Sequence, residues 1–461
     1  MFRFDDFHNG CTDDQLSFML RPEPAPDEAG TVSKSSNADC SRMEFRTSIA
    51  DDIIRIYTPL RIGDKTFLYR EERGCYSIAS DAEVDSIVEK LIDLPANNSQ
   101  AFTASVRHEI QRRRFYKTFS FNPSTCFVNF SDTVFDLKTE RKDLHDPSYC
   151  FNYVLNCSPF KTSKDDFKKS VVRRFLLQIC EEDGQKFRLL QEHCGVLLTG
   201  LHCKGAFFWI GVHDSGKSTL ANLLRCAIGE NNASAVPFSQ FDAQFSKAKL
   251  CGSRINIGGE FNQKSTEAQW NFFKEVTGGD VVSVEEKYCD PVHMVIQSKL
   301  LFLGNFLPHN MPDDDALYDR IKLLEFSYCV PKSERDPELQ QKLYAEKDIF
   351  AWWALKGAMR YLKKGYRFTE LPDQTDIRMI GNPIARFLSK TIETATSNEY
   401  VPKIDLYTMF SENCLQCSIQ KIPTKQQFYK ELKIHFPQSE IKQPMINGKK
   451  QYVIYGIRYK K

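Results

Sequence analysis

Residues 211–219 read GVHDSGKST, and this stretch decides the predicted fold. The apolar run AFFWI at residues 206–210 precedes it and is typical of a buried strand. Residues 219–228, TLANLLRCAI, follow it with apolar side chains at helical spacing. The order is strand, glycine-containing loop and helix, which predicts an α/β fold with a loop at the end of a strand.

That order is the context in which a phosphate-binding P-loop forms. Backbone N–H groups of such a loop and of the following helical turn converge on phosphate oxygens, and the glycines let the backbone come close. Lys217 would reach the β- and γ-phosphates, and the Ser218 hydroxyl would bind Mg²⁺. We therefore expect a site for ATP and Mg²⁺, with an idle glycine turn as the alternative. The predicted nucleotide-binding residues are Gly211, Asp214, Ser215, Gly216, Lys217, Ser218 and Thr219.

The composition limits the number of domains and the kinds of partner that the chain can have. With 461 residues, of which 41% are hydrophobic and 26% charged, the chain can bury a sizeable core and should hold two to four domains. The formal net charge of +2 predicts that nucleic acid would be contacted by local patches rather than by a global basic field. No apolar stretch approaches the length of a membrane span, so no membrane partner is expected.

The cysteine pattern concerns the cellular compartment. The 15 cysteines are scattered singly, and the N-terminal residues lack the apolar core of a secretory signal. They predict reduced, mostly buried thiols in a soluble cytoplasmic protein. Cys414 and Cys417 have the spacing of metal ligands, but without a second pair nearby they favour two thiols on one helix face over a zinc site.

The N-terminal part divides into a tail and a small module. Residues 1–45, with a Pro-rich stretch followed by Ser, Asn and Asp, predict a flexible tail that carries a short docking helix near residues 14–20. Residues 46–160 predict an accessory α+β module. The basic run at residues 112–114 is either a solvated helix face or a contact to a phosphate backbone. The expected elements are helices at 49–57, 81–94 and 105–116, strands at 66–70 and 75–78, and a hairpin of 127–130 with 133–137.

Residues 161–200 are predicted to be helical. Helices are expected at 164–180 and 185–198, because apolar residues recur there three and four apart. The segment lies directly before the strand that leads into the loop. It is either an oligomerisation collar or a helical wall of the nucleotide-binding domain, and the pattern does not separate the two.

Two further strands are predicted to end in polar side chains. A β-like run at 250–259 leads to Glu260, and the apolar run at 299–304 leads to Asn305. A carboxylate at a strand end beside the loop can polarise the attacking water and support Mg²⁺. Glu260 is therefore expected to be the catalytic base and a metal ligand together with Ser218, unless it is an ordinary strand-end acid.

A hairpin and an arginine complete this part of the chain. The runs at 281–284 and 292–296 predict two strands around a tip that carries Lys287 and Tyr288. Arg320 directly precedes another apolar run, which predicts a strand.

The order of these parts resembles the superfamily 3 helicases, and within that group the helicase half of the phage, plasmid and poxvirus primase-helicases. A weaker match of residues 49–160 to the module that precedes the helicase in that family extends the resemblance over most of the chain. The residues that carry it are 211–219, 255–260, FKEVTGGD at 273–280, 302–305 with Pro308, Arg320, and Arg335-Asp336-Pro337 leading into 352–357.

The resemblance implies an AAA+ P-loop ATPase domain at residues 201–370 that assembles as a hexameric ring around DNA. Asn305 would position water against the γ-phosphate, and Arg320 would reach the neighbouring subunit's site as an arginine finger. Lys287 and Tyr288 would grip DNA in the central channel, through a charge on phosphate and an aromatic ring on a base. Arg320 as a structural ion-pair residue and Lys287 on a solvated loop are the alternatives. The family often has two adjacent basic residues where this chain has Arg320 alone.

Residues 371–461 predict a winged-helix DNA-binding domain. Helices are expected at 388–394, 402–414 and 424–436, followed by a hairpin around Asn447-Gly448. Lysines are concentrated there, which suits contact with phosphates, and a wing that docks a protein is the alternative. The predicted DNA contacts in this domain are Lys425, Lys430, Lys449 and Lys450.

Together these observations predict an ATP-dependent replicative DNA helicase of a mobile genetic element or phage, a homo-hexamer that translocates on single-stranded or forked DNA. A fused primase domain would need several hundred further residues ahead of the helicase, so primer synthesis is expected to come from a separate protein. Two other functions stay open. One is an ATP-dependent origin-binding initiator or loader without processive unwinding, and the other is a non-replicative P-loop ATPase switch.

Overall fold

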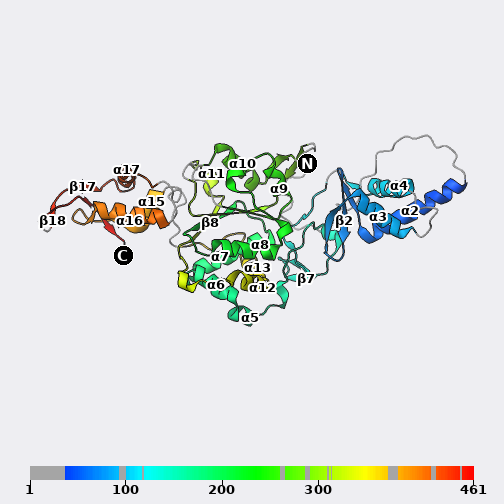
Figure 1. Cartoon of the computed structure of the whole chain (residues 1–461), viewed down its shortest axis with the longest axis horizontal. Helices are drawn as coiled ribbons and strands as arrows, with labels where there is room; N and C mark the ends of the chain where they lie inside the picture. Colours follow the sequence, from blue (N-terminus) through cyan, green and yellow to red (C-terminus); the bar gives the residue numbers. More distant parts are fainter. Residues whose placement is uncertain are drawn as a thin grey trace. The chain divides into compact units, whose positions relative to one another are not determined.

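The computed structural model comprises two compact units, residues 1–158 and 159–461 (Figure 1). The unit boundary after Ser158 lies next to the predicted end of the accessory module at residue 160. The residues that the structure describes are 37–92, 100–116, 119–259, 265–285, 291–308, 311–312, 314–371, 383–416, 422–446 and 449–460.

The first unit combines helices with two small sheets. Its elements are α2 Asn37–Tyr57, β1 Leu60–Ile62, β2 Lys65–Arg70, β3 Cys75–Ala79, α3 Asp81–Leu91, α4 Gln100–Arg113, β4 Phe115–Tyr116, β5 Phe127–Asn129, β6 Val134–Asp136 and β7 Arg141–Asp143. One sheet has the order β3-β2-β1-β4, in which β4 pairs with β1 in parallel. The strands β5, β6 and β7 form an antiparallel sheet, which confirms the predicted hairpin.

Several predicted boundaries in this unit are wrong, including the end of the helix expected at 81–94, which is Leu91, and the start of the helix expected at 105–116, which is Gln100. Helix α2 begins at Asn37, because Phe45 and Ile49 pack into the core of the unit and extend the helix beyond the expected 49–57. The flexible tail therefore does not reach residue 45, and the expected docking helix at 14–20 lies outside the described residues. Helix α4 ends at Arg113, and the two aromatic residues of β4 pair with β1 instead, as aromatic side chains favour strands.

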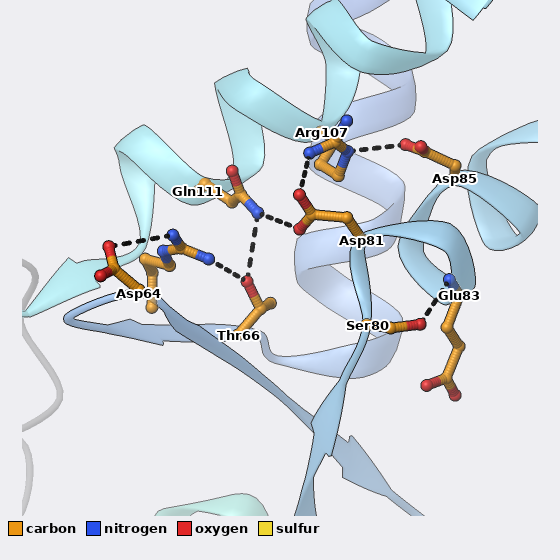
Figure 2. Close-up of polar contacts among 9 residues, drawn as sticks. Asp64, Thr66, Ser80, Asp81, Glu83, Asp85, Arg107 and Gln111 are labelled. Atoms are coloured by element: carbon orange, nitrogen blue, oxygen red, sulfur yellow. Dashed lines mark hydrogen bonds and ion pairs between the residues drawn. The ribbon is translucent and has the colours of Figure 1, made fainter. Parts of the chain in front are cut away.

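A polar network joins α3 to α4 and β2 (Figure 2). The Arg107 Nε of α4 donates to Asp85 Oδ1 at 2.8 Å, and the Arg107 guanidinium also pairs with Asp81. The Gln111 amide donates to Asp81 Oδ1 at 3.1 Å and to the Thr66 hydroxyl at 3.2 Å. The Arg107 side chain is 15% exposed, and those of Asp85 and Asp81 are 29% and 56% exposed, so the bond to Asp85 is the better shielded from water.

Replacing Arg107 with Met should lower the free energy of opening α3 and α4 by about 1–3 kcal/mol, because bonds between charged groups are lost while the carboxylates stay in place. Amide hydrogen exchange of these helices in the full chain measures the change. The control is Arg55→Met, which removes an exposed ion pair with Asp52 on α2 and should have almost no effect. Equal effects of the two substitutions would contradict a stabilising role of the network.

Helices before and after the large sheet build one wall of the second unit. They are α5 Lys164–Lys169, α6 Val171–Ile179, α7 Gly184–Thr199, α12 Leu339–Ala345 and α13 Lys347–Lys363. The single helix predicted at 164–180 is wrong. Ser170 has an extended backbone that ends α5, and its hydroxyl accepts from the Arg173 amide at 3.0 Å and so caps α6.

Helix α7 packs directly against α13 and is buried along most of its length. A Cβ on Gly357 would lie 2.0 Å from the Gln191 carbonyl oxygen, so only glycine permits this approach. Glu192 is fully buried and pairs with Arg360 at 3.3 Å and Lys364 at 3.0 Å. Of the two interpretations of this segment, the burial of α7 favours an internal wall over a surface that contacts another subunit.

His193 of α7 is buried as a neutral imidazole. Its ring lies 4.8 Å from the Phe207 ring and 5.0 Å from the Phe368 ring, measured between centroids. Its Nδ1 has no hydrogen-bond partner among the residues that the structure describes. Burial lowers the pKa of His193 to about 3, because the charged ring would lose its hydration.

The free energy of unfolding should decrease as the pH is lowered, because His193 must stay neutral in the folded protein. Above the ordinary histidine pKa of about 6.5 neither state binds the proton, so the residue has no effect there. Between that value and about 3 only the unfolded chain binds it, which lowers the stability by up to about 1.4 kcal/mol per pH unit. Denaturant unfolding at pH 7 and pH 5 should show a smaller loss for His193→Leu than for the wild type. Identical losses would show that His193 does not contribute.

The second unit is built on a parallel sheet with the order β14-β8-β13-β10-β9. The elements of this part are β8 Ala206–Gly211, α8 Lys217–Ile228, β9 Ala233–Ser234, α9 Ser246–Cys251, β10 Ile255–Gly258, α10 Glu267–Gly278, β13 Lys299–Gly304, α11 Asp315–Tyr318 and β14 Ile321–Phe326. Alternate residues of β8 face opposite sides, since Phe208 contacts Phe273 of α10 and Phe207 contacts α7. Helices therefore cover both faces (Figure 1), as expected for the α/β class. The β-like run predicted at 250–259 is shorter, because residues 250–251 end α9.

The strands β11 Val281–Val284 and β12 Val292–Val295 pair antiparallel, which confirms the predicted hairpin. The C-terminal part has one apolar core, formed by helices and short antiparallel strands. Its helices are α15 Pro383–Thr391, α16 Lys403–Gln416 and α17 Lys425–His435. Its strands are β15 Ile392–Thr394, β16 Tyr400–Pro402, β17 Glu440–Lys442, β18 Met445–Ile446, β19 Lys449–Lys450, β20 Val453–Tyr455 and β21 Ile457–Tyr459.

The predicted C-terminal helices are partly right. Helix α17 follows Thr424, whose hydroxyl caps it as expected. The helix expected at 388–394 is wrong in its last three residues, which form β15 and pair with β21. The β-branched residues Ile392 and Thr394 favour that strand. The ladder of β18 and β19 flanks the predicted Asn447-Gly448 turn, whose residues lie outside the described ranges.

The cysteines whose side chains the structure describes are mostly buried, as predicted. Among those whose side chains the structure describes, Cys329 is exposed, and Cys226 and Cys251 are half-buried. Burial raises the pKa of Cys180 to about 12. Cys414 is buried, Cys417 lies outside the described residues, and the described part of the chain holds no group of three His, Cys, Asp or Glu that could bind a metal ion.

Candidate nucleotide site

The loop at residues 211–216 connects β8 to α8 at the carboxyl edge of the parallel sheet. Ligands of such sheets bind outside the carboxyl ends of the strands. The structure thus confirms the predicted strand, loop and helix. Helix α8 begins at Lys217, and no side chain caps its first turn. The backbone amides of an uncapped helix N-terminus favour binding of an anion.

Two loop glycines are required by close approaches. Gly211 has a φ of +147°, and a Cβ there would lie 1.9 Å from the Phe326 carbonyl oxygen of β14. Gly216 has a φ of +83°, and a Cβ there would lie 2.7 Å from the Ile179 Cγ2 of α6. The backbone of the loop is therefore held between the sheet and a helix.

Gly211→Ala should destabilise the second unit by at least about 3 kcal/mol, because a Cβ would meet backbone that has no room to move and the conformation itself is strained. The control is Gly259→Ala directly after β10 of the same sheet, where a Cβ would meet nothing within 4 Å. Thermal unfolding of both variants measures the difference. An unchanged melting temperature for Gly211→Ala would contradict the close packing of the loop.

Lys217 is turned inward against the loop. Its Nζ donates to the Gly211 carbonyl at 2.9 Å, the Val212 carbonyl at 2.6 Å and the Ser215 hydroxyl at 3.0 Å, and the residue is 8% exposed. A buried ammonium needs such partners, and phosphate oxygens could replace them. Ser218 is exposed and Thr219 half-buried beside it on α8.

Asn305 lies at the same edge as the loop. Strand β13 lies directly between β8 and β10, and its last residue, Gly304, pairs with Ile210 of β8. Asn305 follows Gly304 and is 8% exposed. The structure therefore brings Asn305 level with the start of the loop, as the strand-end pattern predicts, whereas Glu260 lies outside the described residues.

Arg320 lies at the opposite edge of the sheet. It precedes Ile321, which pairs with Ala206 at the start of β8, whereas Phe326 pairs with Gly211. At a rise of about 3.3 Å per residue, Arg320 lies roughly 20 Å along the strand from the loop of its own chain. Its Nη1 donates to the Lys274 carbonyl of α10 at 2.7 Å. The structure thus does not bring Arg320 to the predicted site within one chain.

A segment after β14 contacts the loop, and sequence reasoning gave it no site role. The Arg335 Nη2 lies 2.9 Å from the Asp214 Oδ2, and the Val330 amide donates to the Asp214 carbonyl at 3.0 Å. The Gln340 amide donates to the Thr219 carbonyl at 3.4 Å. The resemblance includes residues 335–337, but their contact with the loop is long-range, so residue spacing could not predict it.

The predicted DNA contacts are placed only in part. Lys287 and Tyr288 lie outside the described residues, as does the side chain of Lys449. Lys430 and Lys450 are exposed on the C-terminal part, and the Lys425 Nζ lies 5.5 Å from the centre of the Tyr407 ring. An exposed lysine suits either a phosphate or a protein carboxylate, so both interpretations of this part stay open.

The basic run of the first unit is engaged within that unit. Arg113 pairs with Asp51 at 2.6 Å, and the Arg114 Nε donates to the Pro59 carbonyl at 2.9 Å. Arg112 lies 3.3 Å from Glu109. These contacts favour the helix-face interpretation over contact with a phosphate backbone.

The described helices include none that is long and apolar enough to cross a membrane.

Comparison with known proteins finds partial similarities. A model of a family of unknown function (DUF5906) matches residues 209–320, which is less than half of the chain. "Putative helicase L207/L206" of Acanthamoeba polyphaga mimivirus is 22% identical over 291 residues, covering 61% of this chain and 30% of that protein. "Putative helicase 121R" of Invertebrate iridescent virus 3 is 27% identical over 238 residues, which cover 48% of this chain and 25% of that protein. "Putative helicase V13" of the Sputnik virophage is 24% identical over 241 residues, which cover 48% of this chain and 29% of that protein.

These relatives agree with the expected resemblance at the level of viral helicase-like proteins. The chain spans about a quarter to a third of their length. Among solved structures, "The A form apo structure of NrS-1 C terminal region-CTR" matches with 14% identity over 86% of this chain and 95% of that chain. The TM-score of that match is 0.44.

Proposed function

We propose that this chain is an ATP-driven DNA helicase motor of a virus or other mobile genetic element, with an AAA+ core at residues 201–370. The observation that carries the proposal is the glycine loop at the carboxyl edge of the sheet, with Lys217 turned toward its carbonyls and Asn305 at the next strand end. The similarity to three viral proteins with helicase in their names supports it.

The loop residues would bind the triphosphate of ATP. Backbone amides of residues 214–219 would face the phosphates, and the Lys217 ammonium would exchange the loop carbonyls for β- and γ-phosphate oxygens. Ser218 and Glu260 would hold Mg²⁺, which neutralises charge on the phosphates. Glu260 would accept a proton from the attacking water, and the Asn305 amide would orient that water.

The position of Arg320 supports a site shared between subunits. Because Arg320 lies at the far edge of its own sheet, it could act on a nucleotide only in a neighbouring copy, as an arginine finger in a homo-hexamer. Its bond to the Lys274 carbonyl supports the alternative, a purely structural role. A test must therefore separate these two roles.

DNA would be held by two parts of the chain. Lys287 and Tyr288 at the tip of the β11–β12 hairpin would contact the strand in the channel of the ring. Residues 371–461, as a winged helix, would add Lys425, Lys430, Lys449 and Lys450. A separate primase would supply primers.

The motor proposal predicts ATP hydrolysis that single-stranded DNA stimulates, and displacement of a strand from forked DNA. Lys217→Ala should lower hydrolysis by more than about a hundredfold, because a charged donor to the phosphates is lost. Lys168→Ala, at an exposed lysine on α5, is the control and should hydrolyse ATP like the wild type. Hydrolysis without any strand displacement would favour an initiator or loader, and a monomer that DNA does not stimulate would favour a switch.

Arg320→Ala should bind ATP normally but hydrolyse it about a thousandfold more slowly, because a finger acts on the transition state. Mixing this variant with Lys217→Ala should restore part of the activity. At some interfaces the Lys217→Ala subunit would supply its intact Arg320 to a loop that keeps Lys217. Hydrolysis assayed at several mixing ratios measures the rescue. If no ratio restores activity, the site is not shared.

A further inference from the structure

Asp214 has a backbone conformation that residues with a side chain seldom adopt. Its φ is +54°, in a loop where the other described residues with positive φ are Gly211 and Gly216. The left-handed region is disfavoured for residues with a Cβ, although aspartate tolerates it better than most. Such a residue keeps its conformation only where surrounding contacts fix it.

Three contacts form a closed ring around Asp214. The Val330 amide donates to the Asp214 carbonyl at 3.0 Å. The Val330 carbonyl accepts from both Nε and Nη2 of Arg335, each at 3.1 Å. The ring closes where the Arg335 Nη2 lies 2.9 Å from the Asp214 Oδ2. Backbone and side chain of Asp214 are thus both fixed by one short segment that follows β14.

We infer that Arg335 is a positioning residue that holds the loop in its phosphate-accepting conformation by acting through Asp214. This inference rests on the nucleotide site proposed above. The φ and ψ of Asp214 set the direction of the Ser215 amide, and they orient the chain that leads to Gly216 and α8. Fixing Asp214 therefore arranges these donors before any ligand arrives, which lowers the cost of binding.

The same contact offsets an unfavourable charge. A carboxylate in a loop that accepts phosphate repels the ligand, and the Arg335 guanidinium compensates for it. The side chains of Asp214 and Arg335 are 55% and 38% exposed, so solvent screens their attraction. The positioning effect therefore depends also on the Arg335 bonds to the Val330 carbonyl, which hold Val330 where its amide donates to Asp214.

Arg335→Ala should weaken the binding of a fluorescent ATP analogue to the full chain by about tenfold, because the loop must then be ordered on binding. Adding Asp214→Gly should recover most of that loss, since glycine adopts a positive φ without strain and carries no charge. The matched control is Lys342→Ala, which removes an exposed ion pair with Asp336 near Arg335 but does not touch the loop. Its affinity should equal that of the wild type.

A second readout needs no nucleotide. Amide hydrogen exchange of residues 212–216 should be faster in Arg335→Ala than in the wild type and should return toward wild-type rates in the double variant. Unchanged exchange in Arg335→Ala would overturn the inference. Recovered exchange without recovered affinity would also overturn it, because Arg335 would then contact the phosphates directly. If the wild-type chain does not bind the analogue while the exchange results hold, the proposed nucleotide function fails and the loop-holding role of Arg335 stands.

Discussion

The close approach between the end of β8 and the end of β14 is the constraint on which the second unit depends. Gly211 lies against the Phe326 carbonyl with no room for a side chain, and the Val212 amide donates to that same carbonyl at 3.1 Å. The loop then passes close to α6, where a Cβ on Gly216 would meet Ile179. Lys217 closes the turn from inside by donating to three loop oxygens. The sheet, α6 and Lys217 together hold the loop in one conformation.

The two edges of the sheet carry different chemistry. The carboxyl edge holds the loop and Asn305, both in contact with well-packed strands. The amino edge holds Arg320, which α10 fixes through the Lys274 carbonyl. Because a strand length separates the edges, the described residues of one chain place the glycine loop at one end and the Arg320 guanidinium at the other. In the hexamer proposed above, a head-to-tail contact would bring the two ends together.

The sequence predicts those parts of the fold that local patterns specify. The strand, loop and helix around residue 211, the β11–β12 hairpin and the Thr424 cap depend on short-range spacing, and all are found. Strand β15 was missed because its pairing with β21 is long-range. The contact of Arg335 with Asp214 was missed for the same reason, since it depends on how the segment after β14 returns to the loop. The neutral state of His193 follows from tertiary burial, which no periodicity reveals.

Cys329 is an exposed thiol in the segment that contacts this loop. It lies directly before Val330, whose amide and carbonyl join the loop to Arg335. Among the cysteines whose side chains the structure describes, it is the exposed one, and burial raises the pKa of others such as Cys150 and Cys180. A thiol reagent should therefore modify Cys329 ahead of these. The natural chain thus carries a labelling position one residue from the contact that holds its loop, without any engineered cysteine.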